Sequence, residues 1–338
     1  SDFLICFPNY WKIKNKIKNM ICCIKLYDNN GHKISSKIVN IYLHNEIYFS
    51  RIFKIKKFSG ILEIDFQSTE NLKFEFPGIT GFYISPKKLI SCVHSAGRLL
   101  SVNQNSSYDK ISEETNFSLK FKKYTTTPFF SLFNSFIEKK NNKIVITLKN
   151  KDNDILAIKT LQKDIILPYS NKIFYLDNYF PEKILKKSEY CIVKTNASDV
   201  FPRMICGNYH RKLHHYEVTH SYPVIKNKKD VINLKKLNPE KYDCYSYLHF
   251  VKSKNSDLEI KIFPTNLKQK INSKLYIYDE KIKKLKFIKK VIFNSGSKMF
   301  NYNMDRNSNF GILKIKQKRI PSRINATYIY KNKNKNNL

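Results

Sequence analysis

The segment between residues 210 and 220 holds the densest group of chemically active side chains in the sequence. Four of the eight histidines lie in it: His210, His214, His215 and His220. Glu217 lies among them and is the only acid in residues 200–229. Imidazole and carboxylate groups are ligands for zinc and iron(II), so His215 and Glu217 could supply two ligands to Zn or Fe in a metal-dependent enzyme that uses the His210–His220 cluster. The third ligand would be one of three histidines: His220, His94 or His249.

A strand over residues 214–221 would divide these side chains between two faces, because successive residues of a strand point in opposite directions. One face would carry His214, Tyr216, Val218 and His220, and the other His215, Glu217 and Thr219. The metal-binding hypothesis requires His215 and Glu217 to share a face, as they do here. Two points weigh against it: the spacing matches no established metal signature, and no second carboxylate is near to orient the imidazoles.

A second interpretation makes the same region a ligand-binding surface. Its side chains surround a predicted turn at Gly207 and combine planar guanidinium groups, an aromatic ring and imidazoles. The candidate ligand-binding residues are Arg203, Asn208, Tyr209, His210, Arg211 and His214, with His94 and Arg98 from an earlier segment. Such groups suit hydroxyl, carboxylate or phosphate ligands, because guanidinium forks bind anions and a ring offers a stacking surface. An anionic glycan is the ligand that fits best.

A third interpretation makes the histidines structural, because part of the pattern occurs twice. Residues 81–95 and 207–221 share the pattern G-x-Y-x10-H-S at an offset of 126, which makes His94 and His220 equivalent. Several residues from Tyr27 to Ile64 recur from Tyr278 to Ile315 at an offset of 251, about twice as large. These offsets predict three related units of about 125 residues, and a packing device recurs with such a unit.

Hydrolytic catalysis is not supported by the motifs. Ser95 and Ser221 directly follow their histidines, so each serine would point away from its neighbour on a strand, and neither lies in a G-x-S-x-G elbow. The chain contains no phosphate-binding loop, dinucleotide fingerprint or H-E-x-x-H motif. The sequence therefore favours a binding or structural protein over an enzyme.

The charge of the chain indicates an anionic partner. Lys and Arg total 62 against 27 Asp and Glu, for a net charge of +35, and only seven of the basic residues are Arg. Part of this excess is typical of drift at solvated positions, where a single charge contributes little to stability. The field still attracts polyanions. An anionic polysaccharide of the cell envelope is the expected partner, and nucleic acid is an alternative because 22 Tyr and 24 Phe accompany the lysines.

Alternating apolar residues, β-branched runs and turn signals predict an all-β fold without long helices. The tetrad from Asp28 to Gly31 is a strong hairpin turn, and residues 151–154 form a weaker one. We expect three tandem β-sandwich units that resemble immunoglobulin-like modular proteins in outline. Their expected limits are 1–110, 111–235 with the histidine-rich segment, and 236–330, followed by a disordered tail over 331–338.

The sequence bears weakly on the compartment. No apolar run reaches the roughly 18 residues that a membrane-spanning helix needs, so no transmembrane segment is expected. Seven cysteines without C-x-x-C spacing do not indicate a disulfide framework. Together with the lack of a signal peptide, they favour a cytoplasmic location, and export stays open as the alternative.

Overall fold

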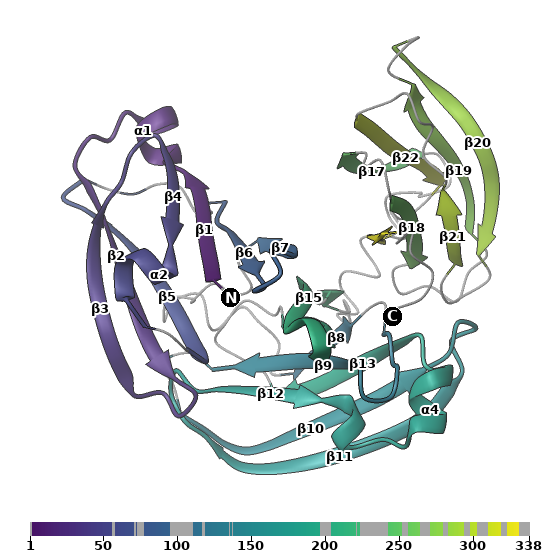
Figure 1. Ribbon diagram of the computed structural model, residues 1–338, viewed down its shortest axis with the longest axis horizontal. Helices are drawn as coiled ribbons and strands as arrows, with labels where there is room; N and C mark the ends of the chain where they lie inside the picture. The colour runs from purple at the N-terminus through teal and green to yellow at the C-terminus, as the bar shows by residue number, and fades with distance from the viewer. Residues whose placement is uncertain are drawn as a thin grey trace. The chain divides into compact units, whose positions relative to one another are not determined.

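The described part of the chain consists mostly of β-strands in antiparallel sheets, as the computed structural model shows (Figure 1). The residues that the structure describes are 2–55, 58–70, 72, 78–94, 111–116, 119–134, 136, 138–196, 204–220, 222–223, 243–251, 256–263, 271–279, 283–293, 298–302, 310–318 and 323–330. Each helix among them has six residues or fewer, which confirms the all-β class. The predicted disordered tail over 331–338 lies outside them.

Contacts divide the chain into two compact units. The first consists of residues 1–148 and 156–223 and contains nearly all of β1 to β16. The second consists of residues 149–155 and 224–338 and contains β17 to β23. The domain limits expected from the sequence, with boundaries near 110 and 235, stay a prediction.

Seven strands at the start of the chain form two sheets. One has the order β4-β1-β6-β7 and consists of β1 (Asp2–Pro8), β4 (His44–Tyr48), β6 (Thr80–Ile84) and β7 (Ile90–His94). The other has the order β3-β2-β5 and consists of β2 (Met20–Asp28), β3 (Lys33–Asn40) and β5 (Gly60–Ser68). Ile5 and Phe7 from the first sheet and Cys22 and Ile24 from the second are buried in one core, so the two sheets pack face to face. Helices α1 (Tyr10–Asn15) and α2 (Phe49–Phe53) lie in the connections.

The predicted hairpin turn joins β2 to β3. The Asp28 carboxylate accepts hydrogen bonds from the backbone N–H groups of Asn30 and His32 at 2.8 and 2.9 Å. Gly31 has φ +88°, a left-handed conformation that disfavours other residues. Beside this turn the Tyr27 ring stacks on Tyr169, with centroids 4.2 Å apart. The hairpin therefore attaches the first pair of sheets to the second.

Nine strands form the second pair of sheets. One has the order β11-β10-β13-β8-β16, with β8 (Ile111–Asn116), β10 (Lys139–Lys149), β11 (Ile155–Ile166), β13 (Tyr190–Asn196) and β16 (Tyr222–Pro223). The other has the order β12-β9-β14-β15, with β9 (Thr126–Phe133), β12 (Asn171–Tyr175), β14 (Ile205–His210) and β15 (His215–His220). Short helical turns η1 (Leu176–Asn178), α4 (Glu182–Lys187) and η2 (Arg211–Leu213) lie between strands.

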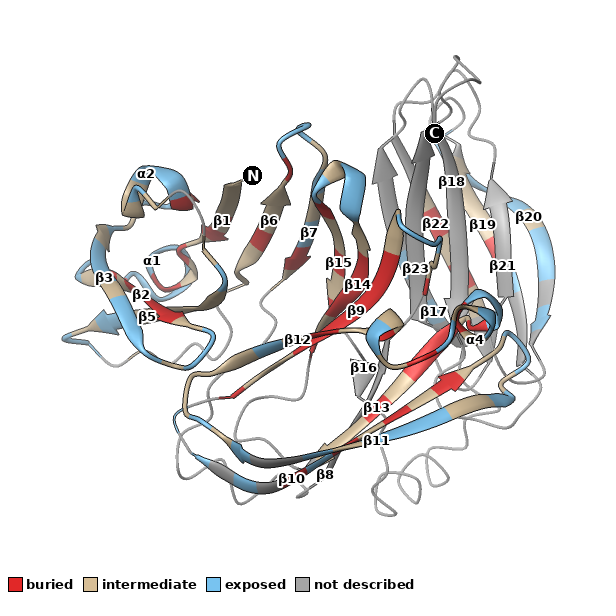
Figure 2. Ribbon diagram, turned by 60° about the horizontal axis from the view of Figure 1, so that its bottom comes forward, coloured by how far each residue is buried: buried red, intermediate tan, exposed pale blue. Residues whose placement is uncertain are grey.

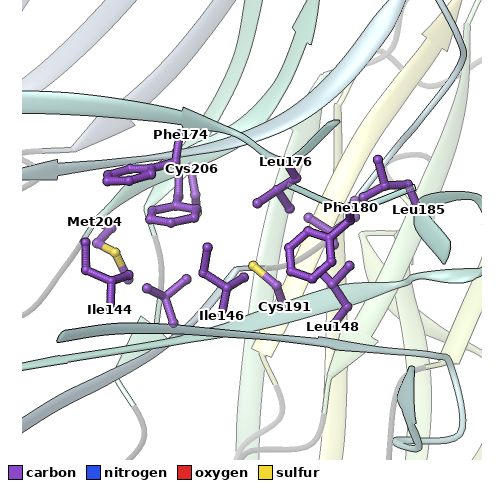
Figure 3. Packing of buried hydrophobic residues seen from close by; sticks show 13 residues of the cluster. Ile144, Ile146, Leu148, Phe174, Leu176, Phe180, Leu185, Cys191, Met204 and Cys206 are labelled. Atoms are coloured by element: carbon purple, nitrogen blue, oxygen red, sulfur yellow. The ribbon is translucent and has the colours of Figure 1, made fainter. Parts of the chain in front are cut away.

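Alternation in β10 creates the largest core. Ile144, Ile146 and Leu148 point from this strand toward Phe174 and Cys206 of the facing sheet, as Figure 3 shows. All five side chains are almost fully buried. At roughly 1.5–3 kcal/mol for each large apolar side chain, this core is the main stabilising contact between the two sheets.

Strand β9 is buried on both of its faces. Phe130 packs in the core just described, whereas Phe129 packs on the other face with Val218 of β15 and Val93 of β7. This arrangement explains why residues 127–131 are all buried and do not alternate with exposed positions (Figure 2). The sheet that carries the histidine-rich strand is therefore covered on one side by its partner sheet and on the other by β7.

The last seven strands form a further two sheets in the second compact unit. One has the order β17-β22-β19-β20, with β17 (Asp243–Val251), β19 (Ile271–Asp279), β20 (Lys284–Phe293) and β22 (Phe310–Lys318). The other has the order β21-β18-β23, with β18 (Ser256–Phe263), β21 (Lys298–Tyr302) and β23 (Arg323–Tyr330). Leu275, Leu313 and Ile315 are fully buried on the inner face of the four-stranded sheet.

Candidate functional site

The histidine-rich strand begins one residue later than expected. His214 has φ +46° and its N–H is bonded to the carbonyl of Arg211, so it closes the η2 turn outside the strand. From His215 onward the predicted alternation holds. Glu217 and His215 lie on the face that carries His210, whereas Tyr216 and Val218 pack on the opposite face.

Gly207 permits the close pairing of β14 with β15. It lies opposite Val218, and its φ of +153° is outside the range that other residues readily adopt. A Cβ atom at this position would lie 1.8 Å from the backbone oxygen of Glu217. The glycine therefore lets Asn208 and His210 reach the side chain of Glu217.

Glu217 is the centre of a polar cluster, which we define as Lys120, Asn208, His210 and Glu217. Its carboxylate lies 3.3 Å from Lys120 Nζ, accepts a hydrogen bond from Asn208 Nδ2 at 3.2 Å and lies 3.4 Å from His210 Nε2. Burial alone would raise the pKa of Glu217. The hydrogen bond with His210 and the Lys120 charge outweigh burial and lower the pKa to about 2. Glu217 is therefore ionised.

Asn208 connects this cluster to the rest of the fold. Its side-chain oxygen accepts a hydrogen bond from the Lys120 backbone N–H at 2.8 Å, and its amide donates to Glu217. The residue is buried. The polar cluster thus fastens strands β14 and β15 to the segment that precedes β9.

His215 is buried next to the cluster, and its Nδ1 atom has no hydrogen-bond partner among the described residues. Its ring lies 6.0 Å from the His210 ring. Burial lowers the pKa of His215, and the neighbouring His210 lowers it further. The imidazole is therefore held neutral.

The proposed metal ligands do not converge on one point. His215 and Glu217 share a face of β15, whereas His220 packs against the His94 ring with centroids 4.3 Å apart. Within the described part of the chain, no group of three or more His, Cys, Asp or Glu side chains is placed to hold a metal ion. Zinc or iron binding stays a prediction, and His249 has no described side chain.

Arg211 is already bound to a carboxylate. Its guanidinium donates to Asp177 Oδ2 at 2.6 Å, and Thr127 Oγ1 donates to Asp177 Oδ1 at 2.6 Å. This pairing joins the η2 turn to η1 and β9. A ligand carboxylate or phosphate would have to compete with Asp177 for the guanidinium group of Arg211.

Tyr209 belongs to an aromatic cluster. Its ring stacks on Tyr216 at 4.4 Å and 26°, and Tyr175 lies 5.8 Å away. The hydroxyl groups of Tyr175 and Tyr216 are 2.7 Å apart. His214 Nδ1 lies 3.4 Å from the Tyr209 hydroxyl. One face of the Tyr209 ring is therefore occupied within the protein.

The structure describes six of the eight residues of the predicted ligand-binding surface, and the surface stays a prediction. Four of its residues, Asn208, Tyr209, His210 and Arg211, have partners within the second pair of sheets. His94 meets His220, and Arg98 and Arg203 lie outside the described residues. Lys120 and Asp177 were not among the predicted site residues. The scarcity of acids was the available signal for Asp177, whereas Lys120 is one of many lysines and carried no such signal.

A second candidate surface lies in the other compact unit, on the outer face of the sheet formed by β17, β19, β20 and β22. Antiparallel pairing aligns two rows of side chains across these four strands. One row is Tyr247, Lys314, Tyr276 and Phe287; the next is Tyr245, Lys316, Lys274 and Lys290. We call these eight residues the lysine–aromatic face.

Three of the four rings of this face are exposed to solvent, and Tyr276 is half-buried. Tyr247 is 53% exposed and Phe287 is 52% exposed, and β20 is drawn as exposed along most of its length (Figure 2). Lys314 Nζ lies 4.3 Å from the centroid of the Tyr245 ring and 5.6 Å from that of Tyr247. No acidic residue belongs to the two rows. The face therefore combines aromatic rings with four lysines.

The sequence matches no protein-family model, and it has no match among curated proteins. In the part of the chain that the structure describes, no helix has both the length and the apolar character needed to cross a bilayer.

Proposed function

We propose that this chain is a non-catalytic binding protein for an anionic polymer, built from three sandwich-like units that arose by duplication. The observation that carries the binding proposal is the lysine–aromatic face, where four lysines and four rings share one sheet surface. Lysines bind phosphate, sulfate and carboxylate groups through charge, and exposed rings add contact area.

The strand orders support the duplication. One order of three neighbouring strands recurs in each predicted unit, as β3-β2-β5, β11-β10-β13 and β20-β19-β22. A second order of three neighbouring strands recurs in the same way, as β4-β1-β6, β12-β9-β14 and β21-β18-β23. Ile24 pairs with Ile64, and the residues 251 positions later, Leu275 and Ile315, pair with each other. An immunoglobulin-like arrangement of these sandwiches is part of the proposal.

The polar groups of the histidine-rich region support a structural role for that region. Glu217 and Arg211, which would be needed for acid–base chemistry or anion binding, each have partners from other segments of the same unit. Groups held in this way stabilise the fold and are less available to a substrate. Binding is therefore assigned to the lysine–aromatic face.

Neutralising the lysines of this face should weaken polyanion binding. We expect replacement of Lys274, Lys290, Lys314 and Lys316 by Gln to lower the slope of log K against log salt by up to about 3 for a single-stranded oligonucleotide, because each lost phosphate contact releases fewer counterions. Binding of fluorescein-labelled (dT)15 and of a labelled heparin fragment, measured by anisotropy at several salt concentrations, tests this expectation.

A second variant separates the effect of this face on binding from the effect of the net charge of the chain. Lys33, Lys37, Lys159 and Lys183 are exposed lysines of the first compact unit, and their replacement by Gln changes the net charge equally. The proposal predicts a much smaller loss for this control. Equal losses in both variants would show diffuse attraction without a site, and failure of both probes to bind the wild-type chain would refute the function.

A further inference from the structure

We infer that the polymer bound by the lysine–aromatic face is a single-stranded nucleic acid. This inference rests on the proposed binding function and names its ligand. It follows from how rings and lysines are arranged relative to each other, and it assigns a role to each of the two rows.

The first row provides a stacking surface. Tyr247, Tyr276 and Phe287 lie in line on β17, β19 and β20, with Lys314 between the first two. Four neighbouring strands span roughly 14 Å, because strands in a sheet lie about 4.8 Å apart. Four-stranded sheets with exposed aromatic residues stack two or three unpaired bases on such a surface. The row therefore has the length needed for a short stretch of bases.

The second row provides the charge. Lys316, Lys274 and Lys290 are cross-strand neighbours beside the aromatic row. A strand of nucleic acid whose bases cover the first row would carry its phosphates along one side of that row, where these ammonium groups lie. Lys314 reaches both Tyr245 and Tyr247, so it can bind a phosphate between the two rows without leaving the rings.

Three rings in one row favour single-stranded nucleic acid over an anionic glycan, because each ring can stack on an unpaired base. Lysines alone are sufficient to bind sulfate or carboxylate groups. A ligand bound only in this way would leave an apolar ring such as Phe287 half exposed to water. Every base has a π-face that covers such a ring, and stacking of this kind tolerates any sequence. The centroids of the Tyr276 and Phe287 rings are 5.7 Å apart and the rings pack edge-to-face, so they are direct neighbours on this surface. The ligand that uses both rows is one that carries both bases and phosphates.

The test compares two oligonucleotides that have the same charge, one with bases and one without, and adds an anionic polysaccharide. The full chain is titrated with fluorescein-labelled (dT)15, with an abasic oligonucleotide of the same length and with a heparin fragment. We expect (dT)15 to bind at least about 10-fold more tightly than the abasic strand. Tyr247→Ala and Phe287→Ala should each weaken (dT)15 binding by about 5- to 150-fold and leave abasic binding unchanged.

Tyr124 supplies the matched control for the ring variants. It is 78% exposed and has a lysine, Lys123, 5.2 Å from its ring, but it lies in the other compact unit. Tyr124→Ala should leave (dT)15 binding unchanged, and circular dichroism should show that all three variants are folded. Equal binding of (dT)15 and the abasic strand, tighter binding of heparin, or no effect of the two ring variants would overturn the inference while the proposed function stands. Absence of binding to all three probes would overturn both.

Discussion

Replacing Gly207 by alanine is expected to destabilise the first compact unit by about 3 kcal/mol or more. The added Cβ would lie 1.8 Å from the Glu217 backbone oxygen, and φ is +153°. Relief of this clash requires β14 and β15 to separate, because the opposing atom belongs to the backbone. Separation would also remove the contacts of Asn208 and His210 with Glu217. Urea unfolding of the variant and wild-type chains measures the loss.

Gly81→Ala is the matched control, because Gly81 lies at the position that the 126-residue offset makes equivalent to Gly207. The Cβ added at Gly81 would lie 2.5 Å from the Phe3 ring. A side chain such as Phe3 can move away, whereas the backbone carbonyl opposite Gly207 is held by the pairing of two strands. We therefore expect a smaller loss than at Gly207. An equal or larger loss at Gly81 would contradict the role assigned to the β14–β15 pair.

Replacing Glu217 by Gln is expected to lower the free energy of unfolding by about 2 kcal/mol at neutral pH. The charged carboxylate, whose side chain is 25% exposed, would be lost from between Lys120 and His210. A glutamine of the same shape keeps the packing but leaves Lys120 without its ion-pair partner in the cluster. Unfolding in urea at pH 7 gives the difference.

The pH dependence of the same variant provides a second measurement. The pKa of Glu217 in the folded chain is about 2, below the ordinary value of 4.5. Its stabilising contribution is therefore complete above about pH 4.5 and is lost as the pH falls toward 2. Wild type and Glu217→Gln should converge in stability over this range.

Glu182 is a suitable control for the carboxylate. It forms ion pairs with Lys123 and Lys186 on the surface, where such pairs contribute little. Glu182→Gln should have nearly the same pH profile as wild type. A Glu217→Gln variant that stays parallel to wild type from pH 5 to pH 2 would show that Glu217 is not held ionised by the polar cluster.

Local patterns were sufficient to predict part of the strands and the main hairpin turn. Alternation identified β10 through Ile144, Ile146 and Leu148, and the residues from Asp28 to Gly31 identified the hairpin turn. These features depend only on neighbours in the sequence. The start of β15 was placed wrongly, because His214 looks like a strand residue but adopts a left-handed conformation that the preceding η2 turn imposes.

The candidate sites were harder to predict because they depend on distant partners. Asn208 and Glu217 were visible as neighbours in the sequence, but Lys120, which binds both, comes from a segment almost ninety residues earlier. The lysine–aromatic face depends even more on residues that are distant in the sequence. Tyr247, Tyr276, Phe287 and Lys314 lie on four different strands, and only the sheet order and register place them in one row.

Hydrogen–deuterium exchange of the full chain with and without saturating (dT)15 tests the proposed binding face most directly. The proposed binding mode predicts slower backbone exchange in residues 243–251, 271–279, 284–293 and 310–318, which form the sheet beneath the lysine–aromatic face. It predicts unchanged exchange in residues 205–220, because the polar cluster there is structural. Protection of residues 205–220 with no change in the four strands would contradict the account and return the binding site to the histidine-rich region.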